Sequence, residues 1–176
     1  MWIFGYGSLM FDGWECEYDC IDRKLVSLAG YKRTFNKKSV GNWGTKNNPG
    51  LTLNLTQTDE GTCYGVGFEF ADDSERRNEM LETLGKREAC EPREVRVCLD
   101  DRLSVALVYI YEGPRLIDEP MSLEQKTRMV LGARGKSGTC FDYVKNIHEG
   151  LKSKGLDDPA VTELWKAVQN RLARSA

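Results

Sequence analysis

Short runs of apolar residues, and runs in which apolar and polar residues alternate, recur along the first part of the chain. The first of them, Trp2-Ile3-Phe4, has the length of a buried strand and breaks at once into Gly5-Tyr6-Gly7-Ser8. Residues 51–56 alternate with the period of a half-buried strand, and residues 58–61 are expected to form a turn that ends at Gly61. Residues 63–70 follow so closely that we expect a hairpin. Further strands are predicted within residues 24–35, with a turn at Gly30, and over residues 94–99 and 103–111.

Helical periodicity marks one segment between these strands and three segments after them. In the first, Leu84 and its apolar neighbours form one face, and Gly85 interrupts the pattern. A capping box that starts at Ser122 opens the second helix, and Asp158-Pro159 opens the fourth. The third and fourth helices carry apolar stripes: Phe141, Val144, Ile147 and Leu151, then Val161, Leu164, Trp165, Val168 and Leu172.

This order of elements predicts an α+β fold, because strands and helices are largely segregated along the chain and do not alternate as βαβ units. Short strands separated by turns indicate a curled mixed sheet or a small β-barrel, here flanked by helices. The chain has 176 residues and shows no internal repeat, low-complexity stretch or linker. We therefore expect residues 1–176 to form a single domain.

Composition and charge narrow the range of partners. The chain is 40% hydrophobic and 30% charged, with a formal net charge of −2, which argues against nucleic acid or an anionic membrane as the main partner. No apolar run approaches the roughly 20 residues that span a bilayer. The first apolar run is too short for a signal peptide and has no basic segment before it. We expect a soluble, cytoplasmic protein.

Six cysteines and one histidine limit the available chemistry. No pair of cysteines has Cys-x-x-Cys spacing, and Cys16 and Cys20 lack a further Cys or His to complete a set of zinc ligands. We therefore expect reduced thiols and no metal site. His148 lies in an amphipathic helical pattern and is expected on a helix surface, so catalysis by Ser-His-Asp or Cys-His is expected only if His148 itself serves. A thiol-redox protein is an alternative that the scattered cysteines disfavour.

The glycine-rich break after the first strand is a candidate binding loop. Gly5 and Gly7 allow backbone angles that other residues avoid, so N–H groups around Ser8 could face an anion or a polarised carbonyl oxygen. An ordinary strand followed by a turn explains these residues equally well. A dinucleotide-binding loop is disfavoured because its third glycine is missing, and no Gly-Lys-Ser/Thr follows to make a P-loop. The long loop over residues 36–50 is expected to be functional or mobile.

Glu88 is a candidate catalytic carboxylate. It stands just after Gly85, where a helix gives way to a loop, and a carboxylate turned inward there could transfer protons. The alternative is a solvated residue at the helix end that pairs loosely with Lys86 or Arg87, and surface pairs of that kind are common and weak. From these residues alone, the surface alternative is favoured.

Six segments in order along the chain resemble motifs of the γ-glutamylcyclotransferases, most closely the ChaC-like, glutathione-directed branch. Any one match is weak, but six in register are specific, and they span nearly the whole chain. The segments are Phe4-Gly5-Tyr6-Gly7-Ser8-Leu9-Met10, Arg33 with Phe35, Trp43-Gly44-Thr45 with Asn48-Pro49-Gly50, Leu84-Gly85-Lys86-Arg87-Glu88, Gly135-Lys136-Ser137-Gly138 with Tyr143-Val144, and Gly155-Leu156-Asp157-Asp158-Pro159.

The resemblance implies the γ-glutamylcyclotransferase fold and a lyase-type reaction. A γ-glutamyl group, expected to be that of glutathione, would cyclise to 5-oxoproline and release the amine, Cys-Gly, with no metal or organic cofactor. Glu88 corresponds to the family's general acid/base. The residues implied to bind the small-molecule substrate are Tyr6, Gly7, Ser8, Leu9 and Tyr143.

Three departures from the family pattern concern the pocket and leave alternatives open. Ala89-Cys90-Glu91-Pro92 follows Glu88 where the family often has Gly-Gly-Tyr, Asn42-Trp43-Gly44-Thr45-Lys46 replaces His-Arg-Gly-Thr-Pro, and Cys140 replaces a usual asparagine. Glutathione specificity is therefore less secure than cyclotransferase activity. The alternatives are a cyclotransferase for other γ-glutamyl amines or amino acids, and a non-catalytic γ-glutamyl- or glutathione-binding protein of the same fold.

Overall fold

The computed structural model describes residues 1–71 and 74–174, and its contacts divide the chain into two compact units. The first unit consists of Met1–Lys32 and Leu55–Gly113, and the second of Arg33–Asn54 and Pro114–Ala176. Two long strands, β2 (Asp22–Ser39) and β3 (Gly50–Glu69), contribute residues to both. The chain thus passes from one unit to the other within each of these strands.

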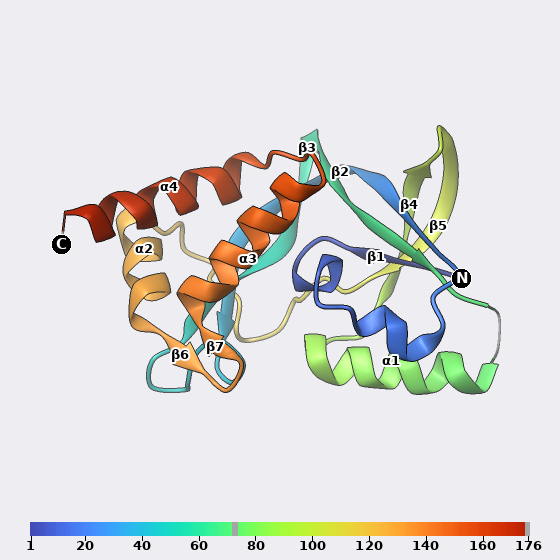
Figure 1. Ribbon diagram of the computed structural model, residues 1–176, viewed down its shortest axis with the longest axis horizontal. Helices are drawn as coiled ribbons and strands as arrows, with labels where there is room; N and C mark the ends of the chain where they lie inside the picture. The colour runs from blue at the N-terminus through green and yellow to red at the C-terminus, as the bar shows by residue number, and fades with distance from the viewer. Residues whose placement is uncertain (72–73, 175–176) are drawn as a thin grey trace. The chain divides into compact units, whose positions relative to one another are not determined.

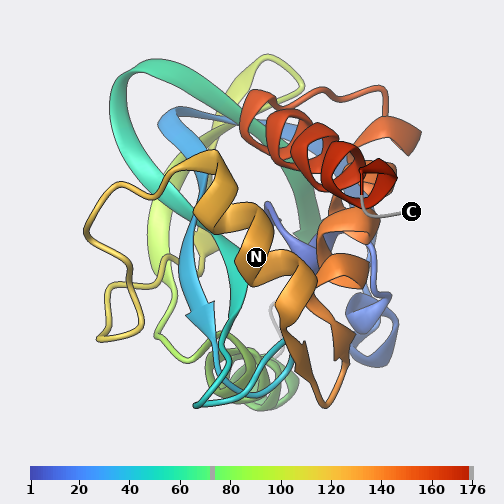
Figure 2. The ribbon, with the colours of Figure 1, turned by 90° about the vertical axis from the view of Figure 1, so that its left-hand side faces the viewer.

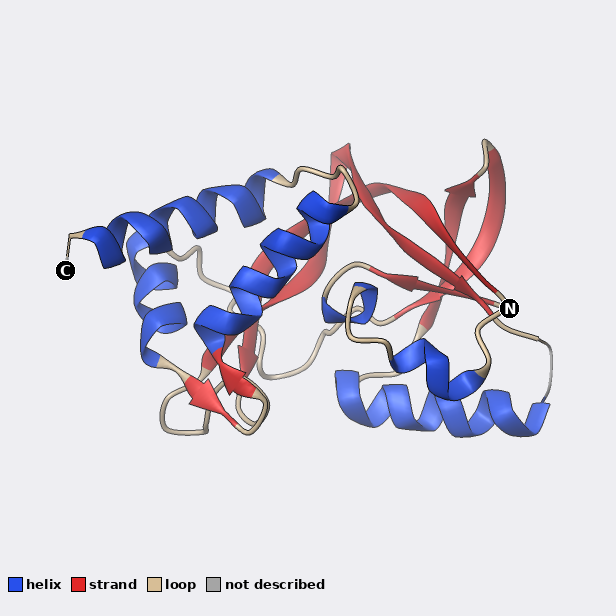
Figure 3. Cartoon of the chain, viewed as in Figure 1, coloured by secondary structure: helices blue, strands red, loops and turns tan. Residues whose placement is uncertain are grey.

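Five strands close into a barrel in the order β1-β3-β2-β4-β5 (Figure 3). β1 (Trp2–Gly5) runs antiparallel to β3 and parallel to β5 (Arg102–Val108), and this parallel pairing closes the sheet. β4 (Arg93–Leu99) pairs antiparallel with β5 over its whole length. Ile3 and Phe4 are both fully buried, as their uninterrupted apolar run predicts, and since successive residues of a strand point to opposite faces, both faces of β1 are covered here. A mixed barrel in a chain that also carries helices confirms the expected α+β fold.

Two of the predicted turns are wrong. Residues 51–56 and 63–70 were expected to form a hairpin, but β3 continues without a break from residue 51 to residue 69, and Gly30 lies inside β2. Gly30 (φ 76°) and Gly61 (φ 141°) both take backbone angles that side chains disfavour. Glycines in such conformations can bend a strand or form a bulge without ending it. The glycines that resemble turn signals therefore lie within continuous strands.

Helix α1 (Ser74–Glu88) belongs to the first unit (Figure 1). It buries the predicted apolar face, which includes Leu84. Gly85 was expected to interrupt the helix. This prediction is wrong, because the helical backbone continues to Glu88. It stops at Ala89, which has φ 60° and donates its N–H to the carbonyl oxygen of Gly85 at 2.7 Å. Glu88 is therefore the last residue of a regular helix.

Three helices of the second unit pack against one another (Figure 2). Their predicted starts are confirmed, since the capping box at Ser122 is formed and Asp158 accepts the N–H of Val161 at 3.2 Å. None of the helices within residues 1–71 and 74–174 is long and apolar enough to cross a membrane. The elements of this unit outside β2 and β3 are α2 (Leu123–Gly132), β6 (Arg134–Gly135), β7 (Gly138–Thr139), α3 (Cys140–Ser153) and α4 (Pro159–Ala173).

The single histidine lies where α3 meets α4. The imidazole of His148 stacks on Trp165, with ring centroids 5.4 Å apart and an interplanar angle of 24°. Partial burial, and then the nearby charge of Lys152, lower the pKa of His148. The histidine therefore packs as a neutral ring between two helices, which suits the structural role expected of it.

A buried ion pair joins β2 to the start of α4 within the second unit. Arg33 Nη1 lies 3.1 Å from Asp158 Oδ2, and the two side chains are only 2% and 13% exposed. Asp158 is also the N-cap of α4. One carboxylate thus serves both the buried guanidinium and the first turn of the helix, so it fixes where α4 begins along β2.

Candidate functional site

The loop after β1 is a single turn of 3₁₀ helix, Ser8–Met10. The N–H of Met10 donates to the carbonyl oxygen of Gly7, and the N–H of Phe11 donates to that of Ser8, each at 3.0 Å. These bonds define the turn, and Ser8 and Leu9 stand at its start. The first N–H groups of a helix have no acceptor within the helix itself. The loop is therefore compact, and its start is the part suited to hold a polar group.

Tyr6 and Leu9, which precede and follow Ser8 in the loop, are buried and attach the loop to the rest of the first unit. Tyr6 is buried, and its hydroxyl donates to the carbonyl oxygen of Tyr109 at 2.9 Å. Leu9 is buried too, and its carbonyl oxygen accepts the indole N–H of Trp14 at 3.0 Å. Tyr6 and Leu9 thus anchor the turn to the first unit, while Ser8 stays half-buried between them.

Glu88 is mostly buried at the end of α1. Its side chain is 19% exposed, and its Oε1 lies 3.4 Å from the Nε of Arg87. Lys86, the other cation that the sequence offered as a partner, pairs with Glu82 one turn earlier on the helix, at 2.5 Å. Of the surface alternative that the local sequence favoured, the loose pairing with Arg87 is confirmed, but the solvated side chain is not, since most of Glu88 is enclosed. The carboxylate lies against the first unit with one guanidinium beside it.

Arg87 connects this carboxylate to the loop after β1. Its Nη2 donates to the hydroxyl oxygen of Ser8 at 3.1 Å and also contacts the carboxylate of Asp12, while its Nε faces Glu88. All four residues belong to the first unit. The structure thus brings together two sequence motifs that are about eighty residues apart, through a single side chain.

Tyr109 lies behind Glu88 and was not singled out by the sequence. It is almost fully buried, and its hydroxyl points to the carbonyl oxygen of Leu81 in α1 at 3.4 Å. Burial, and next the charge of Glu88, raise the pKa of Tyr109 strongly. The phenol therefore stays protonated and links α1 to the segment just after β5, where the carbonyl oxygen of Tyr109 also accepts the Tyr6 hydroxyl. Asp12 follows the loop directly in the sequence, but its contact with Arg87 has no local sequence signal, and neither has the placement of Tyr109, because the folded chain alone brings these segments to the end of α1.

Tyr143, the remaining predicted site residue, belongs to the second unit. It is buried on α3, where its hydroxyl oxygen accepts the N–H of Leu53 in β3 at 3.1 Å. Its ring packs on that of Trp43, with centroids 5.4 Å apart. Trp43, one of the departures from the family pattern, therefore fixes the orientation of Tyr143.

Cys140, another departure, makes similar contacts one turn earlier on α3. Its thiol accepts the N–H of Leu51 and donates to the carbonyl oxygen of the same residue, each at 3.2 Å. Burial raises the pKa of Cys140 to about 11, so the proton that it donates is retained at neutral pH. A thiol here satisfies one donor and one acceptor of the β3 backbone, as an asparagine side chain also could.

Cys140→Ala is expected to lower the free energy of unfolding by about 1–3 kcal/mol, because the buried N–H and C=O of Leu51 lose this partner. Cys140→Ser keeps a donor and an acceptor and should lose less. Urea unfolding of the two variants tests this. Equal midpoints for wild type and Cys140→Ala would show that the two bonds add nothing to stability.

The loop over residues 36–50 is fastened within the second unit. The N–H groups of Lys136 and Ser137 donate to the carbonyl oxygens of Gly41 and Asn42, each at 2.9 Å. A Cβ added at Gly44 would lie 2.0 Å from the backbone nitrogen of Gly50, so the middle of the loop approaches its end as closely as only glycine permits. The loop was expected to be functional or mobile, and both stay predictions.

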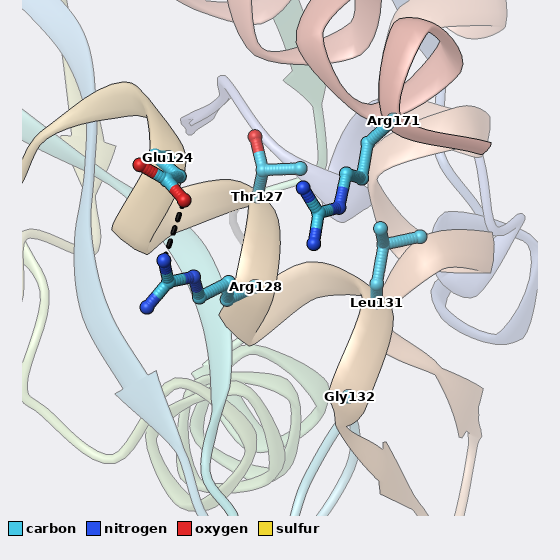
Figure 4. Close-up of a pocket in the computed structure, with 6 residues that line it drawn as sticks. All are labelled: Glu124, Thr127, Arg128, Leu131, Gly132 and Arg171. Atoms are coloured by element: carbon cyan, nitrogen blue, oxygen red, sulfur yellow. Dashed lines mark hydrogen bonds and ion pairs between the residues drawn. The ribbon is translucent and has the colours of Figure 1, made fainter. Parts of the chain in front are cut away.

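A shallow cavity of about 280 Å³ in the second unit is separate from the predicted site residues (Figure 4). It lies between α2 and α4, and Arg128 pairs with Glu124 at its edge, at 2.5 Å. Its lining consists of Glu124, Thr127, Arg128, Leu131, Gly132 and Arg171, none of them a predicted site residue. Within residues 1–71 and 74–174, no three His, Cys, Asp or Glu side chains gather in a way that could hold a metal ion.

Comparison with known proteins gives one consistent family. A family model described as ChaC-like protein matches residues 1–171. Gamma-glutamylcyclotransferase 2-3 of Arabidopsis thaliana is 28% identical over 185 residues, which cover 99% of this chain and 92% of that protein. The glutathione-specific gamma-glutamylcyclotransferase of Escherichia coli (strain K12) is 28% identical over 99% of this chain and 75% of that protein.

Among solved structures, a yeast gamma-glutamylcyclotransferase specific to glutathione has a TM-score of 0.84. It is 19% identical, and the match covers 97% of this chain and 96% of that chain. At this identity the likeness concerns the fold, and it confirms the fold that the sequence motifs implied.

Proposed function

Since this chain belongs to the ChaC-like protein family, we propose that it is a γ-glutamylcyclotransferase and that its substrate is glutathione. The α-amino nitrogen of the γ-glutamyl group bonds to that group's own γ-carbonyl carbon, and the γ-amide bond breaks. The products are 5-oxoproline and Cys-Gly. The observation that supports this most is the contact of Arg87 with both Ser8 and Glu88, because it joins a candidate binding loop to a candidate base.

The protein needs no nucleophilic side chain for this reaction, because the nucleophile is the α-amine of the substrate. A flexible γ-glutamyl chain must be folded so that its amine approaches its own carbonyl carbon, which removes most of the entropic barrier. The substrate ammonium carries three protons, of which one stays on the lactam nitrogen and two reach the leaving nitrogen. We propose that Glu88 accepts protons from the ammonium and returns them to the leaving nitrogen.

We propose that the turn from Tyr6 to Leu9 holds the γ-glutamyl group. Tyr6 and Leu9 are tied to buried partners, so the backbone at Gly7 and Ser8 is held in place before the substrate arrives. Backbone N–H groups at the start of this turn suit the α-carboxylate or the oxyanion that develops on the γ-carbonyl. The family resemblance also makes Tyr143 a proposed substrate contact.

This reaction needs no metal or organic cofactor, since it neither transfers electrons nor needs an activated water. We also propose that residues 1–176 act as a single domain on a small-molecule substrate and that the protein works in the cytoplasm. All six cysteines are thiols, which suits a reducing compartment.

The choice of substrate is tested by a panel of γ-glutamyl compounds. Glutathione, γ-glutamyl amino acids and γ-glutamylamines are compared by the kcat/KM for release of 5-oxoproline. The highest value is expected for glutathione. A higher value for a γ-glutamylamine would support the cyclisation reaction but reject glutathione as the preferred substrate. Binding of glutathione in calorimetry without any turnover would favour a non-catalytic protein.

Ser8→Ala is expected to lower kcat/KM for glutathione by about tenfold, since one hydrogen bond between the loop and the charged Arg87 is lost while the backbone contacts remain. The measurement is steady-state release of 5-oxoproline. A loss as large as that of a variant without the Glu88 carboxylate would show that the Ser8 hydroxyl itself does essential work.

A further inference from the structure

Arg87 stands apart from the other charged residues at the end of α1. Lys86 beside it is exposed and reaches only Glu82 on its own helix. Arg87 points inward, is 27% exposed, and contacts Ser8 and Asp12, which lie 79 and 75 positions away in the sequence. These contacts are long-range: Ser8 belongs to the candidate binding turn, and Asp12 follows it closely in the sequence.

The two ends of the guanidinium face different partners. Nη2 contacts Ser8, the first residue of the turn, and Asp12, which follows the turn, while Nε faces the carboxylate of Glu88. A guanidinium is flat and rigid, so the separation of its nitrogens is fixed. The turn and the carboxylate are thus held apart by the width of one planar group. Hydrogen bonds to charged groups are also stronger than those between neutral groups.

We propose that Arg87 is a positioning residue that sets the Glu88 carboxylate relative to the turn at Ser8, with Asp12 as the anchor that keeps its side chain in place. This inference rests on the proposed function, since it concerns the geometry in which Glu88 meets a substrate held by the turn. The residue acts through Ser8 and Glu88, and it neither donates nor accepts a proton in the reaction.

A lysine cannot replace this arginine on this account. It carries the same charge on a single nitrogen and cannot face the turn and the carboxylate with separate N–H groups. If only the positive charge at position 87 matters, Arg87→Lys should be fully active. If the shape of the guanidinium matters, it should not be, so this variant is the most informative one.

The test compares kcat and KM for glutathione in Arg87→Met, Arg87→Lys and Asp12→Asn, with Lys86→Met as the matched control. For Arg87→Met we expect kcat to fall by about 10- to 100-fold, as for a misplaced catalytic group, while KM changes much less. Arg87→Lys should recover only a minor part of that loss, and Asp12→Asn should lose about threefold to tenfold. Lys86→Met should stay within about twofold of wild type.

A double variant separates positioning from a loss of stability. Because Arg87 and Ser8 are in contact, Arg87→Met combined with Ser8→Ala should lose less activity than the product of the two single losses. Thermal unfolding of each variant gives the fraction folded at the assay temperature, by which kcat is corrected. A kcat of Arg87→Met that returns to the wild-type value after this correction would overturn the proposal.

The remaining outcomes are equally decisive. Full recovery in Arg87→Lys would show that charge suffices and would reject the positioning role. If Arg87→Met does not fold, Asp12→Asn carries the test, and a wild-type kcat in that variant rejects the proposal. Wild-type protein that releases no 5-oxoproline would contradict the proposed function itself, whereas active wild type with an equally active Arg87→Met contradicts only this inference.

Discussion

Glu88→Gln is expected to lower kcat for release of 5-oxoproline by about 10²- to 10⁴-fold, the usual contribution of a general acid/base. The amide keeps the size and shape of the side chain, so the end of α1 and its neighbours should stay in place. What is lost is the ability to take up a proton from the substrate ammonium. Initial rates at saturating glutathione measure the effect.

Glu82→Gln is the matched control for this variant. Glu82 lies on the same helix and is exposed, and it pairs only weakly with Lys86 across one turn. We expect a wild-type kcat and an unchanged unfolding transition for it. A Glu88→Gln variant that turns over glutathione nearly as fast as Glu82→Gln would remove Glu88 from the mechanism.

Asp158→Ala is expected to cost about 3–5 kcal/mol in the free energy of unfolding, the largest stability effect that we predict. The buried guanidinium of Arg33 loses the carboxylate that faces it, and α4 loses its N-cap at the same time. Losing this carboxylate is costly for a buried guanidinium, because water cannot take its place without opening the structure around it. Urea unfolding followed by circular dichroism gives the value.

Two further variants separate the contributions of Asp158. Asp158→Asn keeps an oxygen that can cap α4 but removes the charge, so it should be more stable than Asp158→Ala by about 1 kcal/mol. Asp157→Ala removes an exposed neighbouring carboxylate and should cost less than about 1 kcal/mol. If Asp158→Ala is no less stable than Asp157→Ala, the buried pair does not secure the start of α4.

Local sequence patterns predicted which strands and helices exist better than they predicted where the strands end. The helix starts at Ser122 and Asp158 followed from capping residues, which act within one turn of chain. Gly30 and Gly61 were misread, because a glycine with positive φ looks the same in a turn and inside a continuous strand. Whether the chain turns there is decided by the partner strands, and the local sequence does not contain them.

In the candidate site too, local sequence predicts the residues but not the long-range contacts between them. Ser8 and Glu88 were predicted from motifs, and the structure places both in the first unit. The local sequence favoured a solvated Glu88 paired with Lys86 or Arg87: the pairing with Arg87 is confirmed, whereas the solvation is wrong, since burial at a helix end depends on segments that are distant in the sequence. The contacts of Arg87 with Ser8 and Asp12 had no local signal either, because they form only when β1 and α1 meet on one barrel.

The central claim is that this chain cyclises the γ-glutamyl group of glutathione, and product analysis tests it most directly. The purified protein is incubated with glutathione, and 5-oxoproline, Cys-Gly and free glutamate are measured by liquid chromatography with mass spectrometry. We predict 5-oxoproline and Cys-Gly in equal amounts and no glutamate. Intact glutathione would contradict the claim, and so would glutamate in place of 5-oxoproline, since water would then be the nucleophile.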